Sequence, residues 1–109
     1  MKMLTKEIRK NLPKLYSQDG LGDKAVIHVK FFTPWSNWTW YVTEGEPILD
    51  DDGNEIDFRF FGYVCGLENE LGYFHLSQLE EVNGPFGLKI ERDLYYTKET
   101  IGDVKKRGY

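Results

Sequence analysis

The sequence predicts an α+β protein: an antiparallel sheet of four or five strands, with an N-terminal helix and one or two short helices against it. Three observations lead to this prediction. Apolar residues recur at helical spacing near the start, later segments alternate apolar and polar residues, and the connections between those segments are short. Short connections favour antiparallel pairing, because a parallel pair of strands needs a crossover of a dozen or more residues.

The leading helix is expected over about residues 5–12. Its apolar residues are spaced by three or four positions; they are Leu4, Ile8, Leu12 and Leu15. Thr5 is the expected N-cap, because its hydroxyl can accept a hydrogen bond from the first helical turn. Pro13 ends the helix, since proline lacks the amide and clashes with the preceding turn. Residues 17–24 (SQDGLGDK) then form a loop with two glycines.

Four later segments are expected to be strands, because apolar and polar residues alternate in them. They cover residues 25–32, residues 38–44, residues 57–65 and residues 72–76. The first strand is expected to direct its apolar residues to one face; they are Ala25, Ile27, Val29 and Phe31. The first two strands pair antiparallel in this interpretation, and so do the last two.

Glycines mark the turns between these strands. Asp52-Gly53 is a strong signal for a hairpin turn between the second and third strands. Residues 66–72 (GLENELG) are expected to form a turn between the third and fourth strands.

The C-terminal third is expected to be mostly short elements. Ser77 is the predicted N-cap of a helix that runs to Val82, with Glu80 completing a capping box. Residues 89–97 fit either a final strand or an extended segment, and residues 100–106 fit a short helix that frays near the terminus.

The length of 109 residues suits a single domain over residues 1–109. Hydrophobic residues make up 40% and charged residues 29%, which is typical of a globular protein in water. No apolar run is long enough to span a membrane, and the basic start lacks the apolar stretch of a signal peptide. The single cysteine, Cys65, cannot form an intrachain disulfide, so a cytoplasmic location is expected.

Acidic residues are concentrated in the middle of the chain. Residues 44–81 carry eleven acidic residues against one basic residue, Arg59. Such a segment disfavours a broad nucleic-acid surface, although it could attract a basic protein or simply be solvated. Within it, an acidic hairpin insertion is expected at about residues 45–57, with four candidate binding residues: Asp50, Asp51, Asp52 and Glu55.

The acidic hairpin does not fit a calcium loop. With Gly53 at the sixth position of such a loop, the first position falls on Ile48, which cannot ligate a cation. Two histidines and one cysteine are also too few for a typical zinc site. No metal and no cofactor are therefore expected.

Aromatic residues cluster between positions 31 and 41. They are Phe31, Phe32, Trp35, Trp38, Trp40 and Tyr41. One sheet face cannot take all of them, so the rest are either covered by another element or form an exposed patch. Trp and Tyr are favoured anchors at protein interfaces. The second set of candidate binding residues is therefore Phe32, Trp35, Trp38 and Tyr41.

Two alternatives come from other functional classes. Cys65 and His75 lie on strands joined by a short turn and could act as a thiol nucleophile and its base, as in an enzyme. Cys65 is equally compatible with a small core residue. The basic N-terminal helix could instead serve a nucleic-acid accessory protein.

An ordered set of short motifs gives a resemblance to a known family. The motifs are LTKEIRKNLPKLY, VKFFTP, WTWY, FFGYVCG, ELGYFHLSQLEEV and GPFGLKIERDLYY. Over about residues 4–97 the chain resembles the bacterial domain-of-unknown-function family 2958. The resemblance implies a small protein of plasmids, integrated mobile elements or phages, and it implies no catalytic residue.

These observations together predict a small non-enzymatic interaction protein of a mobile genetic element. Its partner is expected to be a protein, and a sharper form of the hypothesis is an inhibitor of a host DNA-binding or defence protein. The sequence leaves the oligomeric state open.

Overall fold

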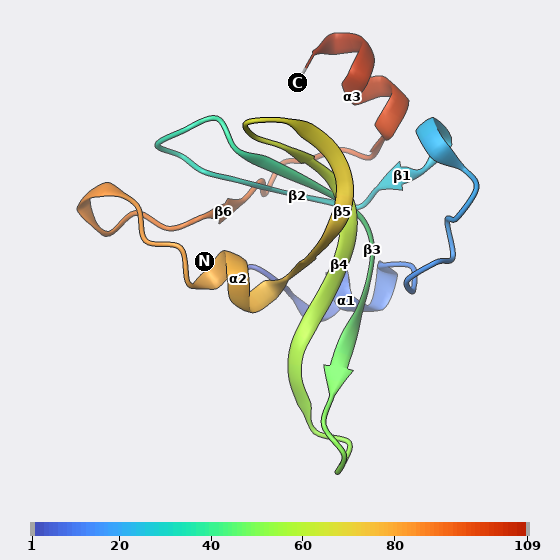
Figure 1. Cartoon of the computed structure of the whole chain (residues 1–109), viewed down its shortest axis with the longest axis vertical. Coiled ribbons are helices and arrows are strands. Elements are labelled where there is room, and N and C mark those ends of the chain that lie inside the picture. Colours follow the sequence, from blue (N-terminus) through green and yellow to red (C-terminus); the bar gives the residue numbers. More distant parts are fainter. Residues whose placement is uncertain (1, 109) are drawn as a thin grey trace.

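The computed structural model describes residues 2–108 and contains a five-stranded antiparallel sheet (Figure 1). The helices are α1 (Lys6–Asn11), α2 (Leu76–Glu80) and α3 (Ile101–Arg107). The strands are β1 (Val26–Ile27), β2 (Val29–Phe32), β3 (Thr39–Leu49), β4 (Glu55–Cys65), β5 (Asn69–His75), β6 (Glu91–Arg92) and β7 (Glu99–Thr100). The large sheet has the order β5-β4-β3-β2-β6, and β1 pairs with β7 in a small second sheet. The α+β prediction is confirmed.

The leading helix begins and ends close to the expected positions. The Thr5 hydroxyl accepts a hydrogen bond from the Ile8 amide at 3.2 Å, so Thr5 is the N-cap. Leu12 is the C-cap, immediately before Pro13. Of the loop that follows, Gly22–Lys24 form one turn of 3-10 helix.

The first expected strand, residues 25–32, is divided at His28. The amide of His28 donates to the Val42 carbonyl at 2.8 Å, which ends the pairing with β3. On the N-terminal side of His28, the two residues of β1 pair with β7 instead. Ile27 therefore packs in a different core from Val29, and the expectation of one shared face is wrong.

Strands β3 and β4 form a longer hairpin than expected. They pair from Thr39↔Cys65 out to Leu49↔Glu55, with a bulge between Val42 and Glu44. The turn is where Asp52-Gly53 predicted it, and Gly53 has a φ of +84°. The expected insertion at 45–57 is thus a continuation of the two central strands.

The sheet is covered on both faces by separate cores. The first core contains Leu4, Leu12, Val29, Phe31, Val42, Phe58, Phe60, Phe74, Leu79 and Ile90. The second core contains Ala25, Ile27, Tyr41, Tyr63, Cys65, Ile101 and Val104. Residues of α1 and α2 pack around the first core and α3 closes the second, at the opposite end of the molecule from the hairpin tip (Figure 1). The short helix expected over residues 100–106 is α3, and its residues Ile101 and Val104 are fully buried.

The segment from β5 to α2 differs from the expectation by a few residues. β5 begins at Asn69, so the predicted turn at 66–72 is shorter. The N-cap of α2 is His75 instead of Ser77, and the His75 amide donates to the Gln78 side chain at 2.8 Å. Ser77 donates to Asp57 instead, at 2.5 Å, which fixes the start of α2 to β4. Of residues 89–97, only Glu91–Arg92 pair as a strand.

Candidate functional site

The outer half of the β3–β4 hairpin, residues 46–57, is here called the acidic arm. β2 reaches along β3 only as far as the pair Val29↔Val42, and β5 reaches along β4 only to His75↔Arg59. Beyond these pairs the two arm strands pair only with each other in the described part of the chain. Figure 1 shows the arm leaving the rest of the molecule along its longest dimension, which measures 44 Å.

The four nominated acidic residues have two different roles at the tip. Asp50 shapes the turn, because its carboxylate accepts the amides of Asn54 and Asp52, both at 2.9 Å. The same hydrogen bonds, first that of Asn54, lower the pKa of the Asp50 carboxyl. Glu55 forms an ion pair with Arg9 of α1. Asp51 and Asp52 are exposed and have no side-chain partner among residues 2–108, so they are the free negative charges.

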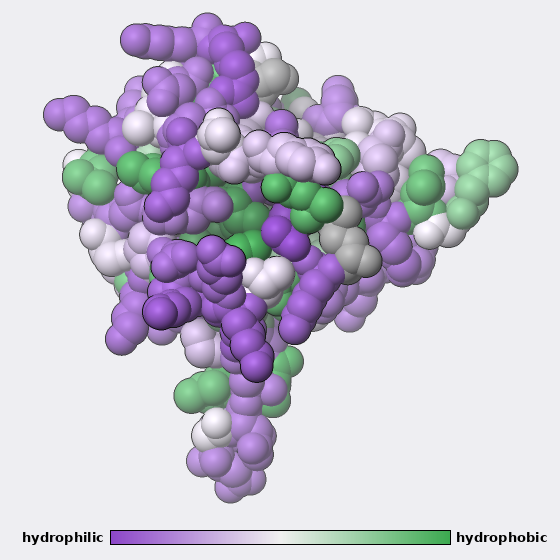
Figure 2. Space-filling view, turned by 180° about the vertical axis from the view of Figure 1, so that it is seen from behind, coloured by the Kyte–Doolittle hydropathy of each residue, from purple (hydrophilic) through white to green (hydrophobic). Residues whose placement is uncertain are grey.

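Two aliphatic side chains flank this acidic tip. Leu49 is 55% exposed and Ile56 is 64% exposed. Figure 2 shows hydrophobic side chains on both flanks of the otherwise hydrophilic arm. These two residues were not among the candidates expected from the sequence. The available signal was their position next to a turn whose three consecutive aspartates cannot be buried.

A groove separates the base of the arm from α1. It has a volume of about 570 Å³ and is lined by Arg9, Lys10, Leu12, Lys14, Gly45, Glu46, Pro47, Leu49 and Phe58. The Arg9 guanidinium lies 4.9 Å from the Phe58 ring centroid. The basic helix is therefore held against the base of the acidic arm.

The other acidic residues of the middle segment lie elsewhere. Glu44 is buried, and its carboxylate accepts the amides of Tyr16 at 2.9 Å and Gln18 at 2.6 Å. Glu68 lies in the β4–β5 turn and Glu70 near the start of β5, at the opposite end of β4 from the arm. The acidic residues thus do not form one continuous face, and the free charge of the arm is local.

The nominated aromatic residues do not form a single patch. Tyr41 is 2% exposed in the second core and is not available for surface contact. Trp38 stacks on Trp40 with a centroid distance of 5.9 Å. Trp35 packs over Gly84, and Phe32 lines a separate hollow with Leu94 and Tyr95. The cluster in the sequence is therefore divided between both faces of the sheet.

The most exposed aromatic residue among residues 2–108 was not nominated. Phe86 lies in the 3-10 turn Pro85–Gly87, is fully exposed and has a φ of +56°. The Pro-Phe-Gly sequence indicated a turn, but nothing in it indicated that the ring projects into solvent.

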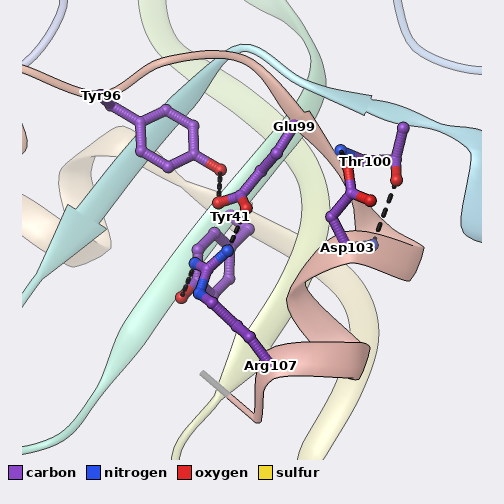
Figure 3. Close-up of polar contacts among 6 residues, drawn as sticks. All are labelled: Tyr41, Tyr96, Glu99, Thr100, Asp103 and Arg107. Carbon is purple, nitrogen blue, oxygen red and sulfur yellow. Dashed lines mark hydrogen bonds and ion pairs between the residues drawn. The ribbon is translucent and has the colours of Figure 1, made fainter.

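Tyr41 belongs to a polar cluster that fixes α3 to the sheet (Figure 3). The Tyr96 hydroxyl donates to Glu99 at 2.6 Å, and Arg107 bonds both Glu99 and the Tyr41 hydroxyl. Burial of Tyr96, together with its bond to Glu99, raises the pKa of the Tyr96 hydroxyl. Asp103 and Thr100 cap the helix reciprocally, at 3.1 and 2.9 Å. These contacts have a structural role, because every polar group in the cluster is engaged by another.

Comparison with known protein families identifies one family for this chain. Residues 3–102 match the family model described as "Protein of unknown function (DUF2958)". The chain belongs to the DUF2958 family. No curated protein and no solved structure matches it.

For this DUF2958 member, the geometry excludes the Cys65–His75 dyad. Cys65 pairs with Asn69, whereas His75 pairs with Arg59, six residues away along β4. That separation is roughly 20 Å at the usual rise of a strand. Cys65 is also buried, and burial raises the pKa of its thiol to about 11, so little reactive thiolate forms at neutral pH.

Asp57, His75 and Ser77 lie together but do not form a catalytic triad. Asp57 is the central residue: it accepts from the Ser77 hydroxyl at 2.5 Å and lies 3.7 Å from His75 Nδ1. A triad needs the histidine between the other two, so that it can take the serine proton. Among residues 2–108 no group of three or more His, Cys, Asp or Glu side chains is placed to hold a metal ion. No helix of this part of the chain is long and apolar enough to cross a membrane.

Proposed function

We propose that this member of the DUF2958 family is a non-enzymatic protein that binds a partner protein through its acidic arm. One observation supports this most: a ribbon that leaves the body of the protein carries two exposed aliphatic side chains beside unpaired carboxylates. The aliphatic and the acidic side chains of the arm would contribute to binding in different ways. Burying Leu49 and Ile56 would contribute about 1.5–3 kcal/mol each, and Asp51 and Asp52 would accelerate encounter with a positive surface.

The partner is therefore a protein with a basic surface next to an apolar recess. A DNA-binding protein of the host has such a basic surface, and the resemblance to proteins of mobile elements supports a role as its inhibitor in the cytoplasm. The arm would act by occupying a local part of that surface, because its free charge is confined to the tip. A nucleic-acid accessory role gains less support, since Arg9 of the basic helix is engaged by Glu55.

The experiment uses the partner that co-purifies with the protein from its native host. The variant is Asp51→Asn with Asp52→Asn, which removes the free charge and leaves the turn-forming Asp50 in place. We expect slower association and a weaker dependence of the association rate on salt. The matched control is Glu68→Gln with Glu70→Gln, which removes the same charge at the other end of β4 and should leave the rate unchanged.

A second variant tests the apolar contribution. Leu49→Ser with Ile56→Ser should increase the dissociation rate of the complex and leave the salt dependence of association intact. Unchanged binding in both arm variants would refute the proposed function.

A further inference from the structure

A small hollow borders the loop that precedes β1, and it is here called the Glu44 hollow. Its volume is about 290 Å³, close to the lower limit of small-molecule sites in proteins, which is roughly 300 Å³. Phe61 of β4, Leu71 of β5 and Ile101 of α3 give it an apolar lining. Its carboxylates are Glu44 of β3 and Asp19 of the loop, and no lysine, arginine or histidine of residues 2–108 lines it. The charge in this lining is therefore only negative.

Glu44 carries the buried charge of the hollow. Only 2% of the residue is exposed, and its two carboxylate oxygens accept one amide each, from Tyr16 and Gln18. No basic side chain in the described part of the chain forms an ion pair with it. A carboxylate has about four lone-pair sites, and a glutamate is almost never fully buried unless it is paired. Two lone-pair sites thus remain, beside a charge that has no cationic partner.

The need to hold the loop does not account for this charge. The neutral Gln18 side chain already fixes the loop to the strands. It donates to the carbonyls of Val26 at 3.1 Å and Thr43 at 2.8 Å, and it accepts from the Val26 amide at 2.9 Å. A buried carboxylate next to these bonds is costly unless something else compensates it.

We propose that the Glu44 hollow binds the ammonium group of a short aliphatic amine. The ammonium group would donate to a free lone pair of the Glu44 carboxylate, which supplies the missing opposite charge. The alkyl chain would pack against the apolar lining, and the exposed Asp19 carboxylate would add to the attraction for a cation.

A metal ion suits this hollow less well than an amine. Calcium takes six to eight oxygen ligands, and magnesium requires a near-ideal octahedron. Only two carboxylates line the hollow, and no group of three or more His, Cys, Asp or Glu side chains in residues 2–108 could hold a metal ion. An amine, in contrast, uses both the carboxylate and the apolar side chains.

The first measurement is an NMR titration of the native full chain with butylammonium chloride at neutral pH, in an amine-free buffer. We expect saturable shifts of the Tyr16 and Gln18 amides, because both donate to Glu44. 1-Butanol has a similar shape without the charge and should bind at least about tenfold more weakly. No saturable shift with butylammonium, equal affinity for butanol, or the same shifts with potassium chloride would overturn the proposal.

The second measurement tests the position of the site. Leu71→Trp brings a larger side chain into the lining and leaves Glu44 unchanged, so it should weaken butylammonium binding at least about tenfold. Leu67→Trp is the matched control, since Leu67 is 92% exposed in the adjacent turn and does not line the hollow. Unchanged binding in a folded Leu71→Trp variant would overturn the proposal.

A third variant tests the charge. Glu44→Gln keeps nearly the same shape, and butylammonium should then bind no better than butanol. Thermal melting followed by circular dichroism checks that each variant is folded. If Glu44→Gln does not fold, the comparison of the two ligands and the Leu71→Trp variant still decide the outcome.

A short peptide with one central lysine carries the same ammonium group. Binding of both the peptide and butylammonium would assign lysine side chains as ligands, whereas binding of butylammonium alone would assign free amines. None of these variants alters the acidic arm, so the outcome is independent of the proposed function.

Discussion

Asp57 shows how one carboxylate can hold two elements together. Burial works against ionisation of this group, but the Ser77 hydroxyl and the amides of Phe58 and Ser77 donate to it and outweigh that effect. The pKa of Asp57 consequently lies below its ordinary value of 3.8. The charged form therefore stabilises the native state and fixes α2 to β4.

This shift predicts a pH dependence of stability. A carboxyl whose pKa is depressed by folding stabilises the native state fully above its unfolded pKa and loses that contribution as pH falls through the native pKa. We therefore expect Asp57→Asn to lower the free energy of unfolding at pH 7 and to flatten its decline below the ordinary pKa. Urea denaturation across the acidic range measures this. Asp51→Asn, which removes a charge without partners, is the control, and an equal effect of both variants would contradict the prediction.

Single residues also show what could be foreseen of the candidate site. The acidic turn was predictable because aspartates and glycine have strong local preferences for turns. The different roles of its aspartates were not predictable. Asp50 forms the turn while Asp51 and Asp52 stay free, and this difference depends on where the folded turn directs its backbone amides. Tyr41 is buried in a core with Ile101 and Val104, which are far away in the sequence, so spacing alone could not indicate its burial.

At two positions in the central strands only glycine fits, because neighbouring elements approach the backbone closely. A Cβ at Gly62 would lie 2.0 Å from the carbonyl oxygen of Tyr41, which is backbone and cannot move aside. At Gly45 a Cβ would lie 2.7 Å from the Leu12 side chain and 2.8 Å from the Phe58 side chain. These residues allow β3, β4 and α1 to approach closely.

The contrast between two glycines of the sheet gives a prediction. Gly62→Ala should destabilise the protein by about 3 kcal/mol, because the new methyl forces β3 and β4 apart. Gly72→Ala should have an effect close to zero, since its Cβ meets open space. Denaturant unfolding of the two variants measures the difference, and similar losses would show that the close approach at Gly62 is not limiting.

At the scale of elements, the strands and their pairing were largely predictable, but their limits were not. Alternation of apolar residues continues through His28, so the sequence does not reveal the change of partner from β3 to β7 at that position. β3 extends through Gly45 and Pro47, residues that rarely favour strands, because pairing with β4 stabilises them. The two-residue pairing of β1 with β7 has no periodic signal at all.

At the scale of the whole molecule, the acidic arm contributes no buried residue to either core. It contacts the body through the Glu55–Arg9 ion pair and through the hydrogen bonds of Ser77 to Asp57 at its base. We predict that replacing residues 49–56 by Asn-Gly, which closes a two-residue hairpin, changes the free energy of unfolding by only about 1 kcal/mol. The same variant should lose the partner that the intact protein captures. Denaturation and pull-down with one preparation test both parts, and a collapse of stability would show that the arm supports the fold.

The change of partner at His28 has a consequence for how the molecule opens. The unit of β1, β7 and α3 is held by two residue pairs between β1 and β7, by the bond from the Ile101 amide to the Ala25 carbonyl and by the cluster around Glu99. Its remaining contacts with the large sheet are those of the second core, into which Ile101 and Val104 pack. Such a unit can detach and close again while β2 to β5 remain intact. Native-state hydrogen exchange should therefore show amides of α3, such as Val104, exchanging through an opening of lower free energy than amides in the centre of β4. Equal opening free energies would mean that both cores unfold in a single cooperative step.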